Sequence, residues 1–388
     1  MRKVAVIGAG QSIYGDFPER SIRSLFRDAF AEATNGVDKG INPKDIQEAF
    51  IGSLGCGGGQ LGLLPAALMS NVGLSGIPAV RVENACASSG FAFRCAVQAV
   101  ASGTCDIALA GGVEKMNETS REQGRYWLGI AGDTEWERLA GTTFPGVYAM
   151  MASRHIYEYG TTEEQLALVA VKNHKNGMQN PKAHLRFETT LEKAMKSPVV
   201  AAPLKLFDCC PTSDGASVAI VCAADVAKTY TDTPVYVIGY GAGSDCLALF
   251  ERDSYTTVRA AVVAAKEAYK MARLEPKNID FAEVHDCFTI AEIMAYEDIG
   301  FCKKGEGGKM IAEGNTRIDG DKPVNASGGL KSKGHPIGAT GVGQIYEIFK
   351  QLRGKAETPS RQLKDVQIGL AHNVGGSGGA ATVHILSV

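Results

Sequence analysis

The sequence predicts a layered α/β protein made of two duplicated halves of βαβαβ type, with a long insertion in the first half. Val4–Gly8 is echoed by Val235–Gly239, and each is a short β-branched run that ends in glycine, as expected of a buried strand. Each run is followed by a helical pattern, Ser21–Asn35 in the first half and Tyr255–Arg273 in the second. The stretch 114–211 has no counterpart in the second half.

The remaining elements correspond in the same order. Two halves of this pattern imply sheets layered with helices in an αβαβα arrangement, related by a pseudo-twofold axis. The matched pairs are strands at Ala49–Ser53 and Ala282–His285, glycine turns opening helices at Cys86–Ala101 and His335–Leu352, strands at Ile107–Gly111 and Val366–Ala371, and closing strands at Gly215–Val221 and Gly379–Ile385.

These repeats set the expected domain boundaries. Residues 1–113 and 212–233 form the first half, residues 234–388 form the second, and residues 114–211 form an inserted subdomain. An insertion at this point of the fold is placed to act as a lid or a binding subdomain.

Two helices are expected within the insertion. They cover Pro145–Tyr159 and Thr161–Asn176, and the second is predicted to begin with a capping box made by Thr161 and Glu164.

Composition excludes several classes of protein. The chain has 388 residues, a formal net charge of -2, 45% hydrophobic residues and 21% charged residues. This balance gives no overall basic surface for nucleic acid or an anionic membrane. No stretch approaches the roughly 18 consecutive apolar residues of a membrane span, and no signal-peptide pattern is seen. The ten cysteines are scattered without a CxxC pair, which predicts reduced thiols in a cytoplasmic protein.

The first glycine motif is not a dinucleotide site. Gly8 and Gly10 follow a strand, but Ile13 stands where the third glycine of the fingerprint is required. We interpret these glycines as structural.

Cys86 is the candidate nucleophile. It lies in Asn84-Ala-Cys86-Ala-Ser-Ser-Gly90, between a short strand and a helix rich in small residues. At a helix N-terminus the macrodipole and free N–H groups lower a thiol pKa and can hold an oxyanion. Without a partner, a buried structural cysteine is the simpler interpretation.

His335 supplies that partner. It lies in the glycine-rich turn Gly334-His335-Pro336-Ile-Gly338-Ala-Thr-Gly341, which the repeat makes the counterpart of the Cys86 turn. Two helix starts related by a pseudo-twofold axis can face each other, which gives the Cys–His adjacency of nucleophilic catalysis.

Two further motifs belong to the second half. His285 and Cys287 lie in Glu-Val-His285-Asp-Cys287-Phe at a strand end, and they share one side if the strand persists. The segment from His372 to Gly379 is a turn whose glycines allow close approach of the backbone to a ligand. A zinc site of Cys209, Cys210, His285 and Cys287 is disfavoured, because adjacent cysteines are poor metal spacing.

Together these four motifs resemble the thiolase superfamily over essentially the whole chain. Within it, the chain resembles the archaeal acetoacetyl-CoA thiolases and the sterol-carrier-protein-linked thiolases, which carry His-Asp-Cys-Phe where other thiolases carry Asn-Glu-Ala-Phe. The last motif departs from the other thiolases, because Asn373 replaces their second catalytic cysteine. The resemblance implies that Cys287 supplies the missing thiol.

The resemblance also implies a mechanism for condensing two acetyl-CoA molecules to acetoacetyl-CoA. Cys86 becomes acylated with His335 as its base, Cys287 acts as acid and base, and His285 and His335 polarise the second thioester. The backbone N–H groups of Cys86 and Gly375 form the other oxyanion hole. No metal or other cofactor is required beyond the CoA thioester substrate.

Three other functions stay open, namely a degradative 3-ketoacyl-CoA thiolase, a 3-hydroxy-3-methylglutaryl-CoA synthase and a non-catalytic acyl-CoA-binding scaffold. The resemblance further implies a homodimer or homotetramer. It also implies a mevalonate-pathway complex with 3-hydroxy-3-methylglutaryl-CoA synthase and a small zinc-ribbon/OB-fold protein that helps hold CoA. Basic residues of the insertion were considered for CoA, although a solvated helical face is the simpler interpretation; they are Lys172, Lys175, Lys182, Arg186, Lys193 and Lys196.

Overall fold

A nine-stranded mixed sheet forms the centre of the protein in the computed structural model, which describes residues 2–388. Its strand order is β3-β2-β4-β7-β1-β8-β11-β10-β9, and a separate hairpin is formed by β5 and β6. The strands are β1 (Val4–Gln11), β2 (Glu48–Gly52), β3 (Ala79–Val82), β4 (Ile107–Glu114), β5 (Val199–Ala201), β6 (Leu204–Lys205), β7 (Gly215–Ala223), β8 (Val235–Ser244), β9 (Phe281–Glu283), β10 (Ile368–Gly375) and β11 (Ala380–Ser387).

The two halves of the chain contribute the two halves of this sheet. Strands β1 and β8 are joined by three residue pairs, Val4 with Val237, Ala5 with Tyr236 and Val6 with Val235. The sequence suggested two sheets, and this short antiparallel junction makes them continuous. The β-branched runs that identified the repeat are therefore the two strands that meet at its axis.

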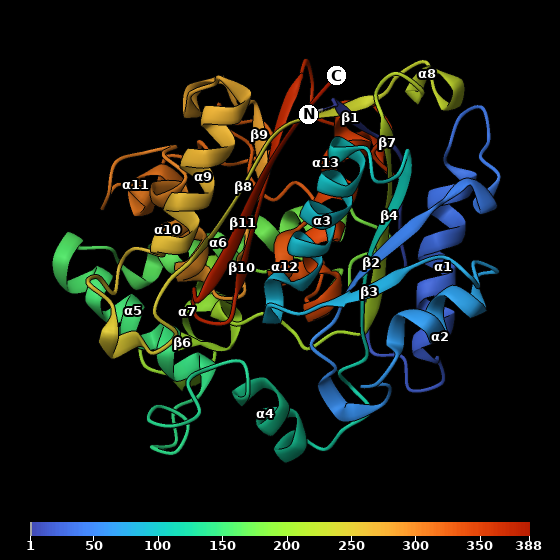
Figure 1. Ribbon diagram of the computed structural model, residues 1–388. Helices are drawn as coiled ribbons and strands as arrows, with labels where there is room; N and C mark the ends of the chain where they lie inside the picture. The colour runs from blue at the N-terminus through green and yellow to red at the C-terminus, as the bar shows by residue number, and fades with distance from the viewer. Residues whose placement is uncertain (1) are drawn as a thin grey trace.

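Helices form three layers around the sheet (Figure 1). Helices α3 and α13 lie between the two halves of the sheet, α1 and α2 cover the outer face of the first half, and α9 and α10 cover that of the second. The helices are α1 (Ile22–Asn35), α2 (Leu64–Asn71), α3 (Ser88–Ser102), α4 (Arg121–Gly129), α5 (Phe144–Tyr159), α6 (Glu163–Met178), α7 (Leu191–Met195), α8 (Ala227–Tyr230), α9 (Arg259–Ala272), α10 (Thr289–Asp298), α11 (Gly307–Ala312), α12 (Gly329–Ser332) and α13 (Thr340–Leu352). The predicted αβαβα layering is confirmed.

Glycines on the two axial strands let their outer helices approach closely. A Cβ atom on Gly10 of β1 would lie 2.1 Å from the carbonyl oxygen of Ala29 in α1. On β8, a Cβ atom on Gly241 would lie 2.0 Å from the carbonyl oxygen of Ala264 in α9. No side chain fits in either place, so the first glycine motif serves packing between helix and strand.

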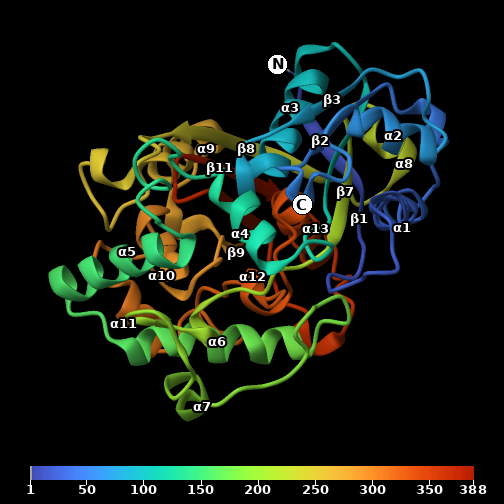
Figure 2. The ribbon, with the colours of Figure 1, turned by 90° about the horizontal axis from the view of Figure 1, so that it is seen from below.

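Helices α4 to α7 and the β5–β6 hairpin occupy the segment between β4 and β7. Helix α6 runs beside α10, α11 and α12 of the second half, α5 contacts α10, and α7 packs on α6 (Figure 2). The capping box of α6 is formed by Thr162 and Gln165, one residue later than predicted. The hydroxyl of Thr161 lies instead 2.8 Å from Nδ1 of buried His155.

No helix among residues 2–388 is both long and apolar enough to cross a membrane. All ten cysteines are free thiols.

Candidate active site

Cys86 lies on a single turn of 3₁₀ helix, Ala85–Ala87, that connects β3 to α3. Ala85, just before it, has a φ of 49°, in the left-handed region that non-glycine residues seldom occupy. Neighbouring side chains hold this backbone: the amide of Ala85 donates to Glu83 at 2.6 Å, and Ser88 Oγ donates to the Ala85 carbonyl at 2.6 Å. Such local strain, fixed by its surroundings, is typical of a functional turn.

The starts of α3 and α13 face each other, as the repeat predicted. A Cβ atom on Gly341 of α13 would lie 2.4 Å from the amide nitrogen of Gly90 in α3. The amide of Val342 donates to Ser89 Oγ at 3.1 Å across the same contact. This packing brings the Cys86 turn and the His335 turn together.

Three predicted residues converge there. The sulfur of Cys86 and one ring nitrogen each from His285 and His335 all lie within 4.8 Å of one another. The two imidazole rings meet edge to face, with centroids 5.1 Å apart and an interplanar angle of 83°. Both histidines are buried, while Cys86 is partly exposed.

Hydrogen bonds fix the tautomer of His335. The Thr340 hydroxyl donates its proton to the carbonyl of Pro336 at 3.1 Å. The same oxygen lies 2.7 Å from His335 Nδ1, so it accepts from an Nδ1–H group. In the neutral ring, Nε2 is then a bare acceptor, which is what a base for the Cys86 thiol requires.

His285 is fixed in the opposite tautomer by Asn373. The Asn373 amide nitrogen donates to the Cys86 carbonyl at 3.0 Å, which sets the orientation of the side chain because a carbonyl can only accept. The same nitrogen lies 3.2 Å from His285 Nδ1, which must therefore accept. His285 Nε2 thus carries a proton, and it is buried without a partner among the described residues. It is a free donor in the site.

This arrangement disfavours a metal centre. Cys86, His285 and His335 form the one converging group of three or more potential ligands found among residues 2–388. A histidine binds metal through an unprotonated nitrogen, and the only such atom of His285 is occupied by the Asn373 amide. The zinc site weighed from the sequence consists of Cys209, Cys210, His285 and Cys287. The ligand atoms of these four residues do not form such a converging group.

Burial keeps the resting nucleophile and base uncharged. Burial raises the pKa of Cys86 to about 12, against the lowering effect of the amides of Gly376 and of Cys86 itself. Burial also lowers the pKa of His335 to about 3. The prediction of a lowered thiol pKa is therefore wrong, because desolvation of the thiolate outweighs the effect of the helix start. A Cys86 thiolate would therefore need a nearby proton acceptor, and His335 Nε2 is the candidate in this cluster.

Cys287 is buried in the loop between β9 and α10. The strand ends at Glu283 and not at His285 as predicted, so it does not persist to carry His285 and Cys287 on one side. The carbonyl of Cys287 accepts from the Cys210 amide at 3.0 Å. Burial, followed by the nearby Cys210 and Cys86 thiols, raises the Cys287 pKa well above its ordinary value.

The terminal glycine turn lies beside the nucleophile. A Cβ atom on Gly375 would lie 2.4 Å from the carbonyl oxygen of Asn84, so only glycine fits against the Cys86 turn. The amide of Gly376, next to the predicted oxyanion donor Gly375, lies close enough to the Cys86 sulfur to lower its pKa. Gly376 has a φ of 60°.

The buried carboxylate of Glu114 joins the loop after β2 to the His335 turn. Glu114, at the end of β4, accepts from the amides of Leu54, Gly55 and Cys56 and from that of Gly338, all between 2.8 and 3.0 Å. Sequence patterns gave no signal for Glu114 or for Thr340, because each acts through contacts distant in the chain.

A second buried network holds the loop of His285 and Cys287. The Asp286 carboxylate accepts from Asn173 on α6 at 2.7 Å, and Asn173 also donates to Glu292 at 2.7 Å. Glu292 pairs with the ammonium of Lys172, and Asn325 donates to Glu292 while accepting from the amide of Val284. These bonds hold the loop in place, although Asn173 Oδ1 is buried without a partner among the described residues.

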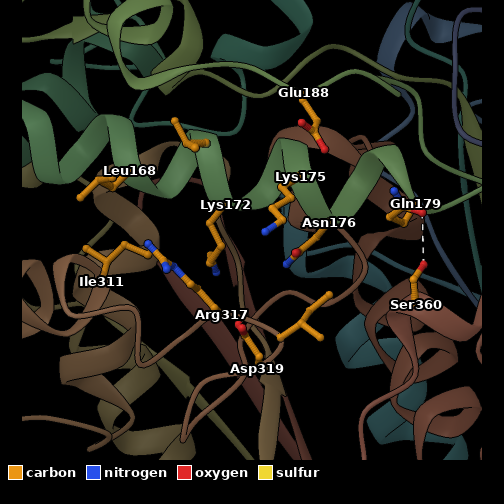
Figure 3. Close-up of a pocket in the computed structure, with 12 residues that line it drawn as sticks. Leu168, Lys172, Lys175, Asn176, Gln179, Glu188, Ile311, Arg317, Asp319 and Ser360 are labelled. Carbon is orange, nitrogen blue, oxygen red and sulfur yellow. Dashed lines mark hydrogen bonds between the residues drawn. The ribbon is translucent and has the colours of Figure 1, made fainter.

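Lys172 also lines a cavity of about 500 Å³ outside the catalytic cluster. Lys172 and Lys175 enter it from α6, and Arg317 enters it from the opposite wall (Figure 3). Cys86 does not line this cavity. Two of the basic residues considered for CoA are structural instead: Lys172 pairs with Glu292, and Lys182 pairs with Glu32.

Comparison with known proteins places the chain in the thiolase family. Residues 4–225 match the family model described as thiolase, N-terminal domain, and residues 241–388 match the one described as thiolase C-terminal domain-like. Together these matches cover most of the chain, so the chain belongs to this family.

Its relatives include both groups that the sequence resembles. It is 49% identical to the acetyl-CoA acetyltransferase of Methanothermobacter thermautotrophicus, over 100% of both chains. It is 32% identical to human sterol carrier protein 2, over 99% of this chain and 71% of that protein. Among solved structures, the Ltp2-ChsH2(DUF35) aldolase matches with a TM-score of 0.86 and 25% identity, over 100% of this chain and 98% of that one.

Proposed function

We propose that the protein is an acetyl-CoA acetyltransferase that reversibly condenses two molecules of acetyl-CoA to acetoacetyl-CoA and CoA. The observation that carries this proposal is the pair of opposite tautomers beside Cys86, an acceptor nitrogen on His335 and a donor nitrogen on His285. One nitrogen can remove a thiol proton while the other stabilises a negative oxygen.

In the first step, the Cys86 proton moves to His335 Nε2 and the sulfur attacks the thioester carbonyl of acetyl-CoA. Backbone N–H groups of Cys86 and of the Gly375–Gly376 turn stabilise the oxyanion. The carbon–sulfur bond to CoA then breaks. CoA leaves as the thiolate, so acylation of Cys86 does not require an acid. Cys287 then donates its proton to that thiolate, which leaves acetyl-Cys86 and a Cys287 thiolate.

In the second step, the Cys287 thiolate removes a methyl proton from a second acetyl-CoA. His285 Nε2–H and protonated His335 stabilise the enolate oxygen. The enolate carbon attacks the acetyl group, a carbon–carbon bond forms, and the bond to Cys86 breaks. The Cys86 thiolate regains its proton from His335, so the enzyme returns to its starting state.

The relatives favour synthesis over other uses of the fold. Identity is 49% to the archaeal acetyl-CoA acetyltransferase and 32% to human sterol carrier protein 2, which favours the archaeal type. We therefore propose a role at the start of the mevalonate pathway, in the cytoplasm, where ten free thiols remain reduced. A degradative 3-ketoacyl-CoA thiolase is the second candidate, because the same residues catalyse thiolysis.

The decisive experiment separates the two thiols. Cys287→Ala should still take an acetyl group from acetyl-CoA, seen by mass spectrometry as a gain of one acetyl, but should not form acetoacetyl-CoA. Cys86→Ala should do neither. Failure of Cys287→Ala to become acetylated would remove Cys287 from the second step, and full activity of Cys86→Ala would overturn the whole proposal.

We also propose a homodimer or homotetramer. Strand β3 is an edge of the nine-stranded sheet. No strand formed by residues 2–388 lies on its outer side, and Val80 on it is 48% exposed. Unpaired edge strands are ready templates for pairing with a second copy. Light scattering at micromolar concentration tests this, and a monomer would contradict it.

A complex with 3-hydroxy-3-methylglutaryl-CoA synthase and a small zinc-ribbon/OB-fold protein is the partner we propose. Large apolar side chains are exposed around α4 and the loops that face it, namely Tyr126, Trp136, Leu139, Leu247 and Phe250. The aldolase Ltp2, which shares the fold, was solved together with ChsH2(DUF35). Co-expression with the candidate partners should lower the Michaelis constant for acetyl-CoA. Tight use of acetyl-CoA by the isolated chain would contradict this.

A further inference from the structure

Tyr148, on α5, contacts both catalytic loops of the second half. It is 2% exposed, and its ring stacks on Phe288 with centroids 4.6 Å apart and an interplanar angle of 26°. Its hydroxyl donates to the carbonyl of Gly376 at 3.0 Å. The same hydroxyl lies close enough to the Cys287 thiol to lower its pKa. One side chain from the inserted segment thus joins the second thiol to the glycine turn beside Cys86.

The second thiol needs such a contact. In the proposed cycle Cys287 is a thiolate between the two steps, and it is buried among groups that do not favour negative charge. Those groups are Cys210, Cys86 and Asp286, and each raises its pKa. Among the groups that act most strongly on this pKa, the hydroxyl of Tyr148 is the one that lowers it. Tyr148 itself faces Cys287, Cys86 and the guanidinium of Arg252.

We propose that Tyr148 is a positioning residue for the carbon–carbon bond-forming step. Its hydroxyl holds the Cys287 sulfur beside the glycine turn, and it turns its hydrogen bond from the Gly376 carbonyl to that sulfur when Cys287 becomes a thiolate. The inference rests on the proposed role of Cys287 as acid and base. It gives the inserted segment a part in the chemistry as well as in covering the site.

Geometry supports this assignment over a purely structural role. A tyrosine that served packing alone needs one partner for its hydroxyl, as Tyr269 does with the carbonyl of Ile299 at 2.9 Å. The Tyr148 hydroxyl reaches a backbone acceptor and a reacting sulfur at once. Phe288 directly follows Cys287 in the chain, so the stack of Tyr148 on Phe288 fixes the Tyr148 ring relative to the loop that carries the thiol.

Tyr148→Phe tests the proposal, because it keeps the ring and its stack and removes only the hydroxyl. Condensation kcat should fall about 10- to 100-fold, the loss expected when a hydrogen bond to a charged group is removed. Acetylation of Cys86 by acetyl-CoA and the Michaelis constant should stay as in the wild type. The pH at which condensation reaches half its maximum should rise, because the Cys287 thiolate has lost its donor.

Tyr269→Phe is the matched control, since it removes another buried tyrosine hydroxyl, one that donates to Ile299 and to neither catalytic loop. It should leave kcat and the pH profile unchanged. Tyr148→Phe added to Cys287→Ala should cause no further loss of condensation. Wild-type kcat and pH profile in Tyr148→Phe, or an equal loss of Cys86 acetylation, would overturn the inference. Condensation by Cys287→Ala alone would instead overturn the proposed function, so the two failures are distinguishable.

Discussion

Removing the hydroxyl of Thr340 should disable the base without touching the nucleophile. Thr340→Val keeps the shape of the side chain and leaves His335 Nδ1–H without its 2.7 Å acceptor. His335 is 6% exposed, so water does not readily replace that acceptor. An unsatisfied buried donor costs about 1–3 kcal/mol, and the ring escapes that cost by moving its proton to Nε2.

The size of the effect follows from this cost. With about 1.4 kcal/mol for each factor of ten, the reactive tautomer becomes roughly 5- to 150-fold less favourable. Acetylation of Cys86, followed by rapid mixing and mass spectrometry, should slow by about that factor. Alkylation of Cys86 by iodoacetamide at neutral pH should slow in parallel, because its thiol is protonated at rest.

Thr340→Ser is the matched control, because it retains the hydroxyl and should react at close to the wild-type rate. Two outcomes would refute the tautomer assignment. One is a wild-type acetylation rate in Thr340→Val. The other is an equally slow Thr340→Ser, which would show that the methyl group is what matters.

Three further predictions concern stability and assembly. Burial lowers the pKa of His384 to about 3, so the folded state resists its protonation and loses stability as the pH falls below about 6.5. The free energy of unfolding, measured by urea denaturation, should therefore fall by about 1.4 kcal/mol per pH unit more in the wild type than in His384→Leu between pH 6 and 4. The same pH dependence in both proteins would contradict this. Gly241→Ala should lower Tm strongly because of its 2.0 Å clash with Ala264, whereas Gly59→Ala, with open space around its Cβ, should not; equal Tm values would contradict the close packing. Ala79→Pro should shift the oligomer toward monomer in light scattering, because the Pro78 and Val82 carbonyls bond β2 and the Ala79 N–H therefore points to the open side of β3; an unchanged mass would exclude β3 from the interface.

The main features of the fold were predictable because the two halves of the sequence contain the same order of strand, helix and turn patterns. The paired strand runs, helices and glycine turns all appear where the repeat placed them. The same symmetry correctly predicted that the helix starts of Cys86 and His335 face each other. What failed was local detail: the capping residue of α6, and the end of β9 before His285.

The remaining features depend on contacts that a linear pattern does not show. Asn373 was noticed as a departure from other thiolases, but its role in fixing the proton of His285 depends on the Cys86 carbonyl, far away in the chain. The thiol pKa of Cys86 was predicted in the wrong direction, because a sequence shows a helix start but not the depth of burial. Tyr148 gave no signal at all.

The three-residue junction between β1 and β8 has a consequence for how the chain could be divided. Cys86 comes from the first half, whereas His285, Cys287, His335 and Asn373 come from the second. A break in the connection from β7 to β8 would therefore give two fragments that each lack a complete reaction centre. Activity restored by mixing the two fragments would show that they reassemble through the β1–β8 junction. The enzyme could therefore be divided there to give an activity assay for fragment association.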